Sequence, residues 1–180
     1  MTSGQEPQVL FEGKYLRLLR KGKWEFVERT GSTGIVVLVP LTENGELVLV
    51  EQLRPPIGKQ VIELPAGLVG DIQGAEDEDL EVAARRELLE ETGYEAGDLE
   101  LLTEGPISAG LSTEIITVYL ARGVKKVGPG GGDDSEDIIF HAVPLSEVGE
   151  WLAEKESQGI LADAKVYSGL YFAMKHKETS

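Results

Sequence analysis

The chain has 180 residues, 41% of them hydrophobic and 27% charged, which is enough for one well-buried domain and marginal for two. Its 32 acidic and 17 basic residues give a net charge of −15. Such an acidic chain disfavours nonspecific binding to nucleic acid or to an anionic membrane. The absence of cysteine excludes disulfides, thiolate zinc sites and a cysteine nucleophile, and two histidines are too few for a multi-histidine metal site.

No apolar run approaches the roughly 20 residues of a membrane span, and residues 1–7 lack a secretory pattern. We therefore expect a cytoplasmic protein that binds neither nucleic acid nor membrane. An acidic enzyme that binds phosphate groups needs local cations, and with few basic residues available a bound metal ion is favoured.

The first third of the chain is predicted to form strands. Three short β-type runs, at residues 9–11, 15–20 and 24–29, precede a joint at 31–34. The continuous apolar run at 35–41 is typical of a strand that is buried on both faces.

Asn44-Gly45 separates this run from a second one at residues 46–52, a strong signal for a β-hairpin. A shorter strand is expected at 60–64. Residues 65–75 are rich in glycine and are predicted to form a loop.

A helix is predicted from an acidic start at residues 76–79, which suits the helix dipole, to Gly93. Within it, Glu87, Glu90 and Glu91 stand at i, i+3 and i+4, so they share one face. Counted at about 100° per residue, Glu87 and Glu91 point with the apolar stripe of the helix, and Glu90 lies just outside it.

Carboxylates on the side of a helix that faces the core are costly unless they are paired or bound to metal. The alternative, an ordinary solvated acidic face, fits poorly with the inward direction of Glu87 and Glu91. A hard divalent cation takes carboxylate oxygens and often bridges to phosphates. Arg86, four residues before Glu90, can pair with it along the helix. The pattern therefore predicts a metal site.

After this helix, strands are predicted at residues 99–103, 115–121 and 138–143. Two helices follow, one capped by Ser146 and the other by Asp163, ending near residues 155 and 176. Strands on both sides of a central helix, with helices at the end, predict an α/β fold in which a mixed β-sheet lies between helices.

Three further segments carry candidate site residues. The turn at residues 64–67 can expose a backbone carbonyl as a ligand for a hard ion. Arg54 is suited to bidentate contact with phosphate, or it makes an ordinary surface ion pair. The glycine-rich acidic loop at 128–137 could supply a base through Glu136 or Asp134, or it is a solvated linker.

Residues 86–94, Arg-Glu-Leu-Leu-Glu-Glu-Thr-Gly-Tyr, resemble the box of the Nudix hydrolases. That box runs glycine, five residues, glutamate, seven residues, and then Arg-Glu-apolar-any-Glu-Glu-any-Gly-apolar. Glu78 and every fixed position after it are filled. Gly67 matches the first glycine, but ten residues separate it from Glu78, and Ile72 stands where strict spacing requires glycine. We interpret this as an insertion around residues 71–75.

The resemblance extends over roughly residues 35–175. It is closest to the branch that cleaves ADP-ribose and related nucleoside diphosphate sugars, and the segments that carry it are 52–56, 63–67, 110–112 and 159–165. One departure is Ala109, which stands where ADP-ribose-specific members usually have proline. It favours a broader or different nucleotide-sugar preference.

The family pattern implies a Nudix α/β/α sandwich at residues 35–180 and an N-terminal strand arm at 1–34 that pairs or swaps in a homodimer. It also implies Mg²⁺ or Mn²⁺ held by Glu87 and Glu91, with Glu90 and the Ala66 carbonyl as further ligands.

Catalytic roles are implied for Arg86 and Glu90 and for a loop acid. Glu136 is the first choice for this base or additional ligand, Asp134 the second and Glu114 the third. Substrate contacts are expected from Arg54, Glu63, Trp24, Leu111 and Ser112. Trp24, Phe26 and Tyr15 are candidates for base stacking, with core or dimer packing as an equal alternative.

The expected activity is metal-dependent hydrolysis of the pyrophosphate in ADP-ribose or another nucleoside diphosphate sugar, giving a nucleoside monophosphate and a sugar phosphate. The alternatives are a Nudix hydrolase for another nucleoside diphosphate derivative, such as a dinucleotide or GDP-mannose, a non-catalytic Nudix ligand sensor, or a structural acidic interaction protein. The intact Arg86, Glu87, Glu90 and Glu91 speak against the sensor.

Overall fold

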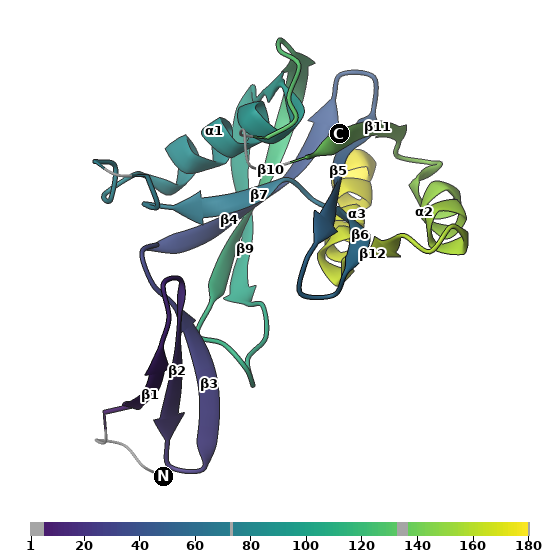
Figure 1. The fold of residues 1–180 in the computed structure, drawn as a ribbon. Helices are drawn as coiled ribbons and strands as arrows, with labels where there is room; N and C mark the ends of the chain where they lie inside the picture. The colour runs from purple at the N-terminus through teal and green to yellow at the C-terminus, as the bar shows by residue number, and fades with distance from the viewer. Residues whose placement is uncertain (1–5, 73, 133–136, 180) are drawn as a thin grey trace.

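The computed structural model describes residues 6–72, 74–132 and 137–179, the last three of these by backbone alone. Two β-sheets and three helices make up the described fold (Figure 1). None of its described helices is both long and apolar enough to span a membrane.

The N-terminal strands form a small antiparallel sheet that projects from the rest of the molecule (Figure 1). It consists of β1 (Gln8–Glu12), β2 (Leu16–Lys21) and β3 (Trp24–Arg29), in that order. We call this sheet the arm. Several of its large apolar side chains are exposed, among them Phe11, Tyr15 and Trp24.

The main sheet is mixed. Its strands run in the order β12-β6-β5-β4-β10-β8, while β11 pairs with β5, β7 with β4 and β9 with β10. The pairs β10–β4 and β12–β6 are parallel and the others antiparallel. The bounds are β4 Gly34–Thr42, β5 Glu46–Arg54, β6 Lys59–Glu63, β7 Ala66–Val69, β8 Tyr94–Glu95, β9 Asp98–Pro106, β10 Ile115–Lys126, β11 Ile139–Pro144 and β12 Leu161–Ala162.

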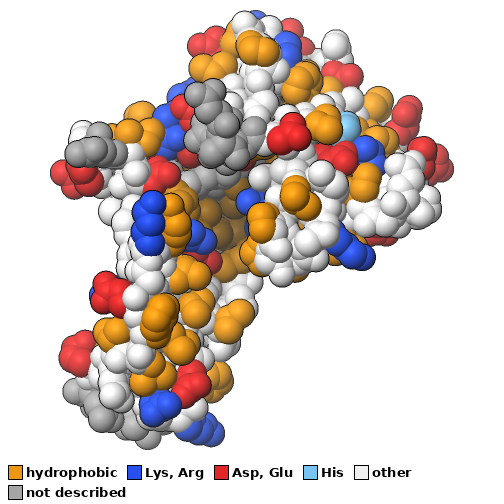
Figure 2. Space-filling model, viewed as in Figure 1, with side chains coloured by type: hydrophobic (Ala, Val, Ile, Leu, Met, Phe, Trp, Pro, Cys, Tyr) orange, Lys and Arg blue, Asp and Glu red, His pale blue; other side chains and the backbone are white. Residues whose placement is uncertain are grey.

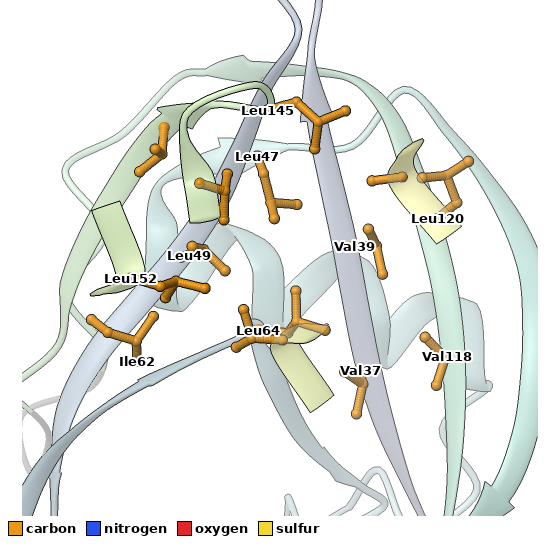
Figure 3. Packing of buried hydrophobic residues seen from close by; sticks show 14 residues of the cluster. Val37, Val39, Leu47, Leu49, Ile62, Leu64, Val118, Leu120, Leu145 and Leu152 are labelled. Carbon is orange, nitrogen blue, oxygen red and sulfur yellow. The ribbon is translucent and has the colours of Figure 1, made fainter. Parts of the chain in front are cut away.

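Helices cover both faces of this sheet: α1 (Leu80–Thr92) on one side, α2 (Val148–Ser157) and α3 (Ala164–Thr179) on the other. Successive β4 residues alternate between the two cores, because Val36 and Leu38 pack toward α1 whereas Val37 and Val39 pack toward α2 and α3. Figure 3 shows Val37 and Val39 in the second of these cores. The predicted strand buried on both faces and the α/β/α sandwich are therefore confirmed.

Two local predictions are wrong. The glycine-rich segment 65–75 contains a strand, β7, whose backbone pairs with β4 from Gly34 to Val37. Pairing across the chain, which no local pattern shows, overrides the loop composition there. Ser146 does not cap α2, which begins after Glu147 with no side-chain cap, whereas Asp163 accepts the N–H of Lys165 as a cap should, at 2.7 Å.

Candidate active site

A cavity of about 590 Å³ opens between α1, β7, β4 and the start of α3. Figure 2 shows the molecule hollowed here, with hydrophobic side chains inside the hollow and basic ones beside it. The side formed by α1, which we call the acidic wall, carries Glu87 and Glu90, and other elements supply Arg29, Arg54 and Lys165. The charged lining residues are Asp71, Glu87, Glu90, Glu63 and Glu114, with Arg29, Arg54, Arg86 and Lys165.

The acidic wall belongs to α1, a helix whose two ends are both capped. Asp79 accepts the N–H of Glu81 at the N-terminus, at 2.9 Å, and Gly93 ends the helix in a left-handed conformation with φ 69°. Glu91 is 4% exposed, whereas the side chain of Glu90 is 52% exposed. The predicted inward direction of Glu91 and the outer position of Glu90 are thus seen in the structure.

Gly67 lets the acidic wall approach β7. A Cβ atom added at Gly67 would lie 1.8 Å from Cδ of Glu87. A side chain at this position would therefore displace the carboxylate, so the glycine is required by close packing rather than by a turn. Gly67, which matches the first glycine of the box, and Glu87 meet directly here, although twenty positions separate them in the sequence.

Arg86 ties the carboxylates of this wall together. Its Nη1 donates to Glu87 at 2.7 Å and to Glu90 at 3.2 Å. Its Nε and Nη2 donate to the two oxygens of Glu78, at 3.0 and 2.9 Å. These bonds lower the pKa of Glu78 and raise that of Arg86, so both groups stay charged. Another Nη2 contact reaches the Leu68 carbonyl at 3.2 Å.

Glu91 closes the wall against β7. One of its carboxylate oxygens accepts the backbone N–H of Ala66 at 3.1 Å. The residue implied as a carbonyl ligand and a residue implied as a carboxylate ligand are therefore in direct contact. This bond also fixes the last turn of α1 to the start of β7.

Glu87 is a carboxyl group whose ionised form is disfavoured by its surroundings. Burial raises the pKa of its carboxyl to about 7, against the opposing effect of Arg86, with Glu90 and Asp71 adding repulsion. A carboxylate placed in this environment gains from any cation that binds beside it. Perturbed groups of this kind concentrate at functional sites.

The donor chemistry of this wall fits a hard divalent cation, because carboxylate and carbonyl oxygens are the ligands that Mg²⁺ and Mn²⁺ take. As they stand, no three acidic or histidine side chains in the described residues are grouped to enclose an ion. Glu87 and Glu90 turn toward Arg86, and Glu91 toward Ala66. Holding an ion therefore requires side-chain rotation away from these partners.

The basic residues of the cavity come from three distant elements. Arg54 at the end of β5 bonds Glu63 at 2.5 Å, and Arg29 at the end of β3 bonds Glu114 at 2.8 Å. Lys165, in the first turn of α3, contacts Asp163 at 2.6 Å. Arg54 thus makes the ion pair considered from the sequence and also lines the cavity.

Arg29 and Lys165 were not among the predicted site residues. Each lies at the end of an element and faces the cavity only because β3 and α3 converge on it. No local motif marks Arg29. Lys165 ends the segment 159–165 that carries the family resemblance and lies two residues after the helix cap Asp163, so a usable signal was present for it.

The predicted aromatic and loop contacts lie elsewhere. Trp24, Phe26 and Ser112 line a separate hollow of about 280 Å³ on the arm. Leu111 is 58% exposed, and its carbonyl accepts the N–H of Val27. Tyr15 is also exposed. Within one chain, none of these residues lines the cavity that contains the acidic wall.

The predicted loop base cannot be placed. Glu136 and Asp134 lie outside the described residues. Glu114, the third choice, lines the main cavity opposite the helix and is held by Arg29.

Comparison with known proteins gives the family. The NUDIX domain matches residues 32–164. The chain belongs to the Nudix family. It is 34% identical to the methanol dehydrogenase activator of Bacillus methanolicus, over 94% of each chain, and 34% identical to the ADP-sugar pyrophosphatase of Mus musculus, over 94% of this chain and 85% of that protein.

A crystal structure of an ADP compounds hydrolase has the same fold, with a TM-score of 0.69 over 99% of this chain and 98% of that one at 19% identity. Together with the family match, these relatives identify the chain as a Nudix hydrolase.

The longer Nudix loop before α1 leaves the outer glutamate in place. Ten residues rather than five separate Gly67 from Glu78, yet the Glu78 side chain is only 7% exposed and accepts two hydrogen bonds from Arg86. The extra residues therefore lie before Glu78. From Glu78 onward, the side chains of the box are joined through the hydrogen bonds of Arg86 to Glu78, Glu87 and Glu90.

Proposed function

We propose that this Nudix hydrolase cleaves the pyrophosphate bond of a nucleoside diphosphate sugar with Mg²⁺ or Mn²⁺, giving a nucleoside monophosphate and a sugar phosphate. One observation carries the proposal: a single cavity is lined both by the α1 carboxylates Glu87 and Glu90 and by cations from three other elements. A diphosphate with bound metal needs both, because the metal binds the carboxylates and the phosphate oxygens bind the cations.

The metal ligands in this proposal are Glu87 and Glu91, with Glu90 and the Ala66 carbonyl as further ligands. The bound ion would neutralise the diphosphate and lower the pKa of a coordinated water. Arg86 positions the carboxylates, since it already bonds Glu87 and Glu90. When Glu87 and Glu90 rotate toward an ion, Arg86 keeps its two bonds to Glu78 and so remains in place.

Phosphate binding falls to Arg54, Arg29 and Lys165. Each of these side chains bonds a carboxylate partner, and that charge-assisted hydrogen bond fixes the position of the cation beside the cavity. Arg54 is the first candidate, because a guanidinium binds phosphate in a bidentate way. Glu63, only 6% exposed, then acts as its orienting partner.

For the base we keep Glu136 as the proposal, with Asp134 as the second choice and Glu114 as the third. Glu114 is already at the cavity, but its ion pair with Arg29 favours a positioning role. Turnover of Glu136→Gln and Glu114→Gln, measured against pH, separates them. The variant that loses the acidic limb of the pH–rate profile, where a general base becomes protonated, has lost the base.

The substrate side of the proposal starts from the mouse relative, named an ADP-sugar pyrophosphatase. Ala109, in place of the usual proline, favours a broader range. A screen of ADP-ribose, ADP-, UDP- and GDP-sugars, dinucleotides and Ap4A with Mg²⁺ and Mn²⁺ tests this. Cleavage in heavy-oxygen water then shows which phosphorus is attacked.

We also propose a homodimer in which the arm, residues 1–34, contributes to the site of the partner. Trp24 lies in a hollow that does not include the carboxylate wall of its own chain, and the arm exposes several apolar side chains. An arm that crosses to a second copy would bury this surface and could bring Trp24 to the nucleobase. A measured mass equal to that of a single chain contradicts this part.

The decisive test of the chemistry is Glu91→Gln, with Glu81→Gln as its control on an exposed face of the same helix. We expect the first change to lower kcat by roughly 10²–10³-fold, as for loss of one group that stabilises transition-state charge. The control should keep activity. Full metal-dependent activity in Glu91→Gln contradicts the metal assignment, and binding without cleavage in the unaltered protein supports a sensor instead.

A further inference from the structure

The C-terminal end of α1 is an unfavourable place for carboxylates. The negative end of the helix dipole lies there, and the last turn contains Glu90 and Glu91 but no basic residue. Its last four carbonyl groups also lack partners within the helix. Both effects favour fraying of the turn that the proposed function needs for binding metal, so something outside the helix must hold it.

A glycine-rich segment, residues 128–132, holds this turn through backbone hydrogen bonds. Gly131 N–H donates to the carbonyl of Glu91 at 2.9 Å, and Gly132 N–H to that of Glu90 at 3.0 Å. Gly128 N–H donates to the Gly93 carbonyl at 3.0 Å. The bonded carbonyls therefore belong to the same residues whose carboxylates are proposed to bind the ion.

This contact requires glycine at positions 93 and 130. A Cβ added at Gly93 would lie 2.2 Å from the Gly128 carbonyl oxygen, and one added at Gly130 would lie 2.4 Å from the carbonyl carbon of Thr92. Gly130 also has a left-handed φ of 69°. The two backbones approach more closely than any side chain permits.

Lys126 supplies the positive charge that the helix end lacks. Its ammonium donates to the carbonyl of Thr92, the last helical residue, at 2.6 Å and to that of Pro129 at 3.0 Å. It also lies 3.4 Å from the centre of the Phe140 ring on β11. Lys126 is exposed as a residue, yet its charged end joins the helix, the glycine segment and β11.

We propose that residues 128–132, fastened by Lys126, are a positioning element that sets the affinity of the α1 carboxylates for the divalent cation. We call this element the clamp. It acts by fixing the backbone of Glu90 and Glu91, and it rests on the metal role given to those residues in the proposed function. Neither Lys126 nor the glycines touch the reacting atoms.

The first test is Gly130→Ala, which changes no charge. The added methyl must push the segment away from Thr92. We expect Mn²⁺, titrated alone and followed by its electron paramagnetic resonance signal, to bind about tenfold more weakly, the lower end of the range for losing an outer partner of a metal site. Gly123→Ala is the matched control, because Gly123 also has a positive φ, of 59°, but an added Cβ meets nothing within 4 Å. Equal Mn²⁺ affinity in both variants overturns the proposal.

The second test is Lys126→Met, where the direction of the change in Mn²⁺ affinity is decisive. Loss of a cation near carboxylates should by itself strengthen Mn²⁺ binding, whereas loss of a positioning element should weaken it. We expect weaker binding, near-normal binding in Lys126→Arg, and no more than about a twofold change in Lys125→Met, whose exposed lysine pairs with Glu43 at 3.3 Å. Stronger Mn²⁺ binding in Lys126→Met overturns the proposal. This outcome can be measured even if the Gly130→Ala protein does not fold.

The kinetic readout separates positioning from general damage. In both clamp variants, the Mg²⁺ concentration for half-maximal activity should rise while the KM for the nucleotide sugar at saturating Mg²⁺ stays constant. Glu91→Gln shows whether the metal assignment itself holds. If Mn²⁺ binding survives Glu91→Gln, the proposed metal site has failed; if it is lost there but unchanged in the clamp variants, only the clamp has failed.

Discussion

The Nudix helix and the N-terminal arm both carry predicted site residues, but these residues differ in how far they are buried and bonded. On α1, Glu91 is buried and bonded to Ala66, and Glu87 is half-buried and bonded to Arg86. On the arm, Trp24 is 58% exposed beside a hollow of its own. The helix carboxylates are thus held by contacts within one chain, whereas the arm leaves its large apolar side chains exposed.

The strongest way to break the helix side of this comparison is Gly67→Ala. The added Cβ would overlap the Glu87 carboxylate, which must move or push β7 away from α1. We expect kcat to fall about 100-fold, because small displacements of a positioned group carry losses of this size. Gly105→Ala in β9, where an added Cβ meets nothing within 4 Å, should leave kcat unchanged. A Gly67→Ala enzyme with normal kcat shows that Glu87 does not need its present position.

How far the sequence predicts each region follows from the range of the interactions. The spacing of Glu87, Glu90 and Glu91 on a helix encodes their shared face, because a helix converts sequence distance directly into geometry. The alternating burial of β4 follows in the same way. β7, Arg29 and Lys165 were missed because their positions depend on how distant segments of the chain come together, which local composition does not encode.

The strain on Glu87 gives the next prediction, on stability. Its folded pKa of about 7 lies above its ordinary value of 4.5. The stability that goes with the protonated form is therefore fully present below pH 4.5 and is lost as the pH rises through 7. In the metal-free protein, Glu87→Gln should raise the free energy of unfolding at pH 8 by about 2 kcal/mol more than at pH 5.

Chemical denaturation at the two pH values measures this difference. Mg²⁺ should reduce it by stabilising the ionised carboxylate of the unaltered protein. Glu90→Gln is the control, since that side chain is 52% exposed and should give a smaller difference. An equal gain in the free energy of unfolding at both pH values means that Glu87→Gln acts through packing and that ionisation of Glu87 does not destabilise the fold.

The smallest expected effect, on the arm, sharpens the comparison most. Trp24→Ala should raise the KM for the nucleotide sugar about tenfold if the indole stacks on the base, since an aromatic pair contributes roughly 0.5–1.5 kcal/mol. Phe11→Ala removes another exposed arm aromatic, on β1, which does not line the Trp24 hollow. If both variants lower the dimer mass measured by light scattering and change KM equally, the aromatics pack a dimer interface and Trp24 is no base contact. A KM effect confined to Trp24→Ala, with the dimer intact, places the base on the arm, and the site would then take its metal from one chain and its base recognition from the other.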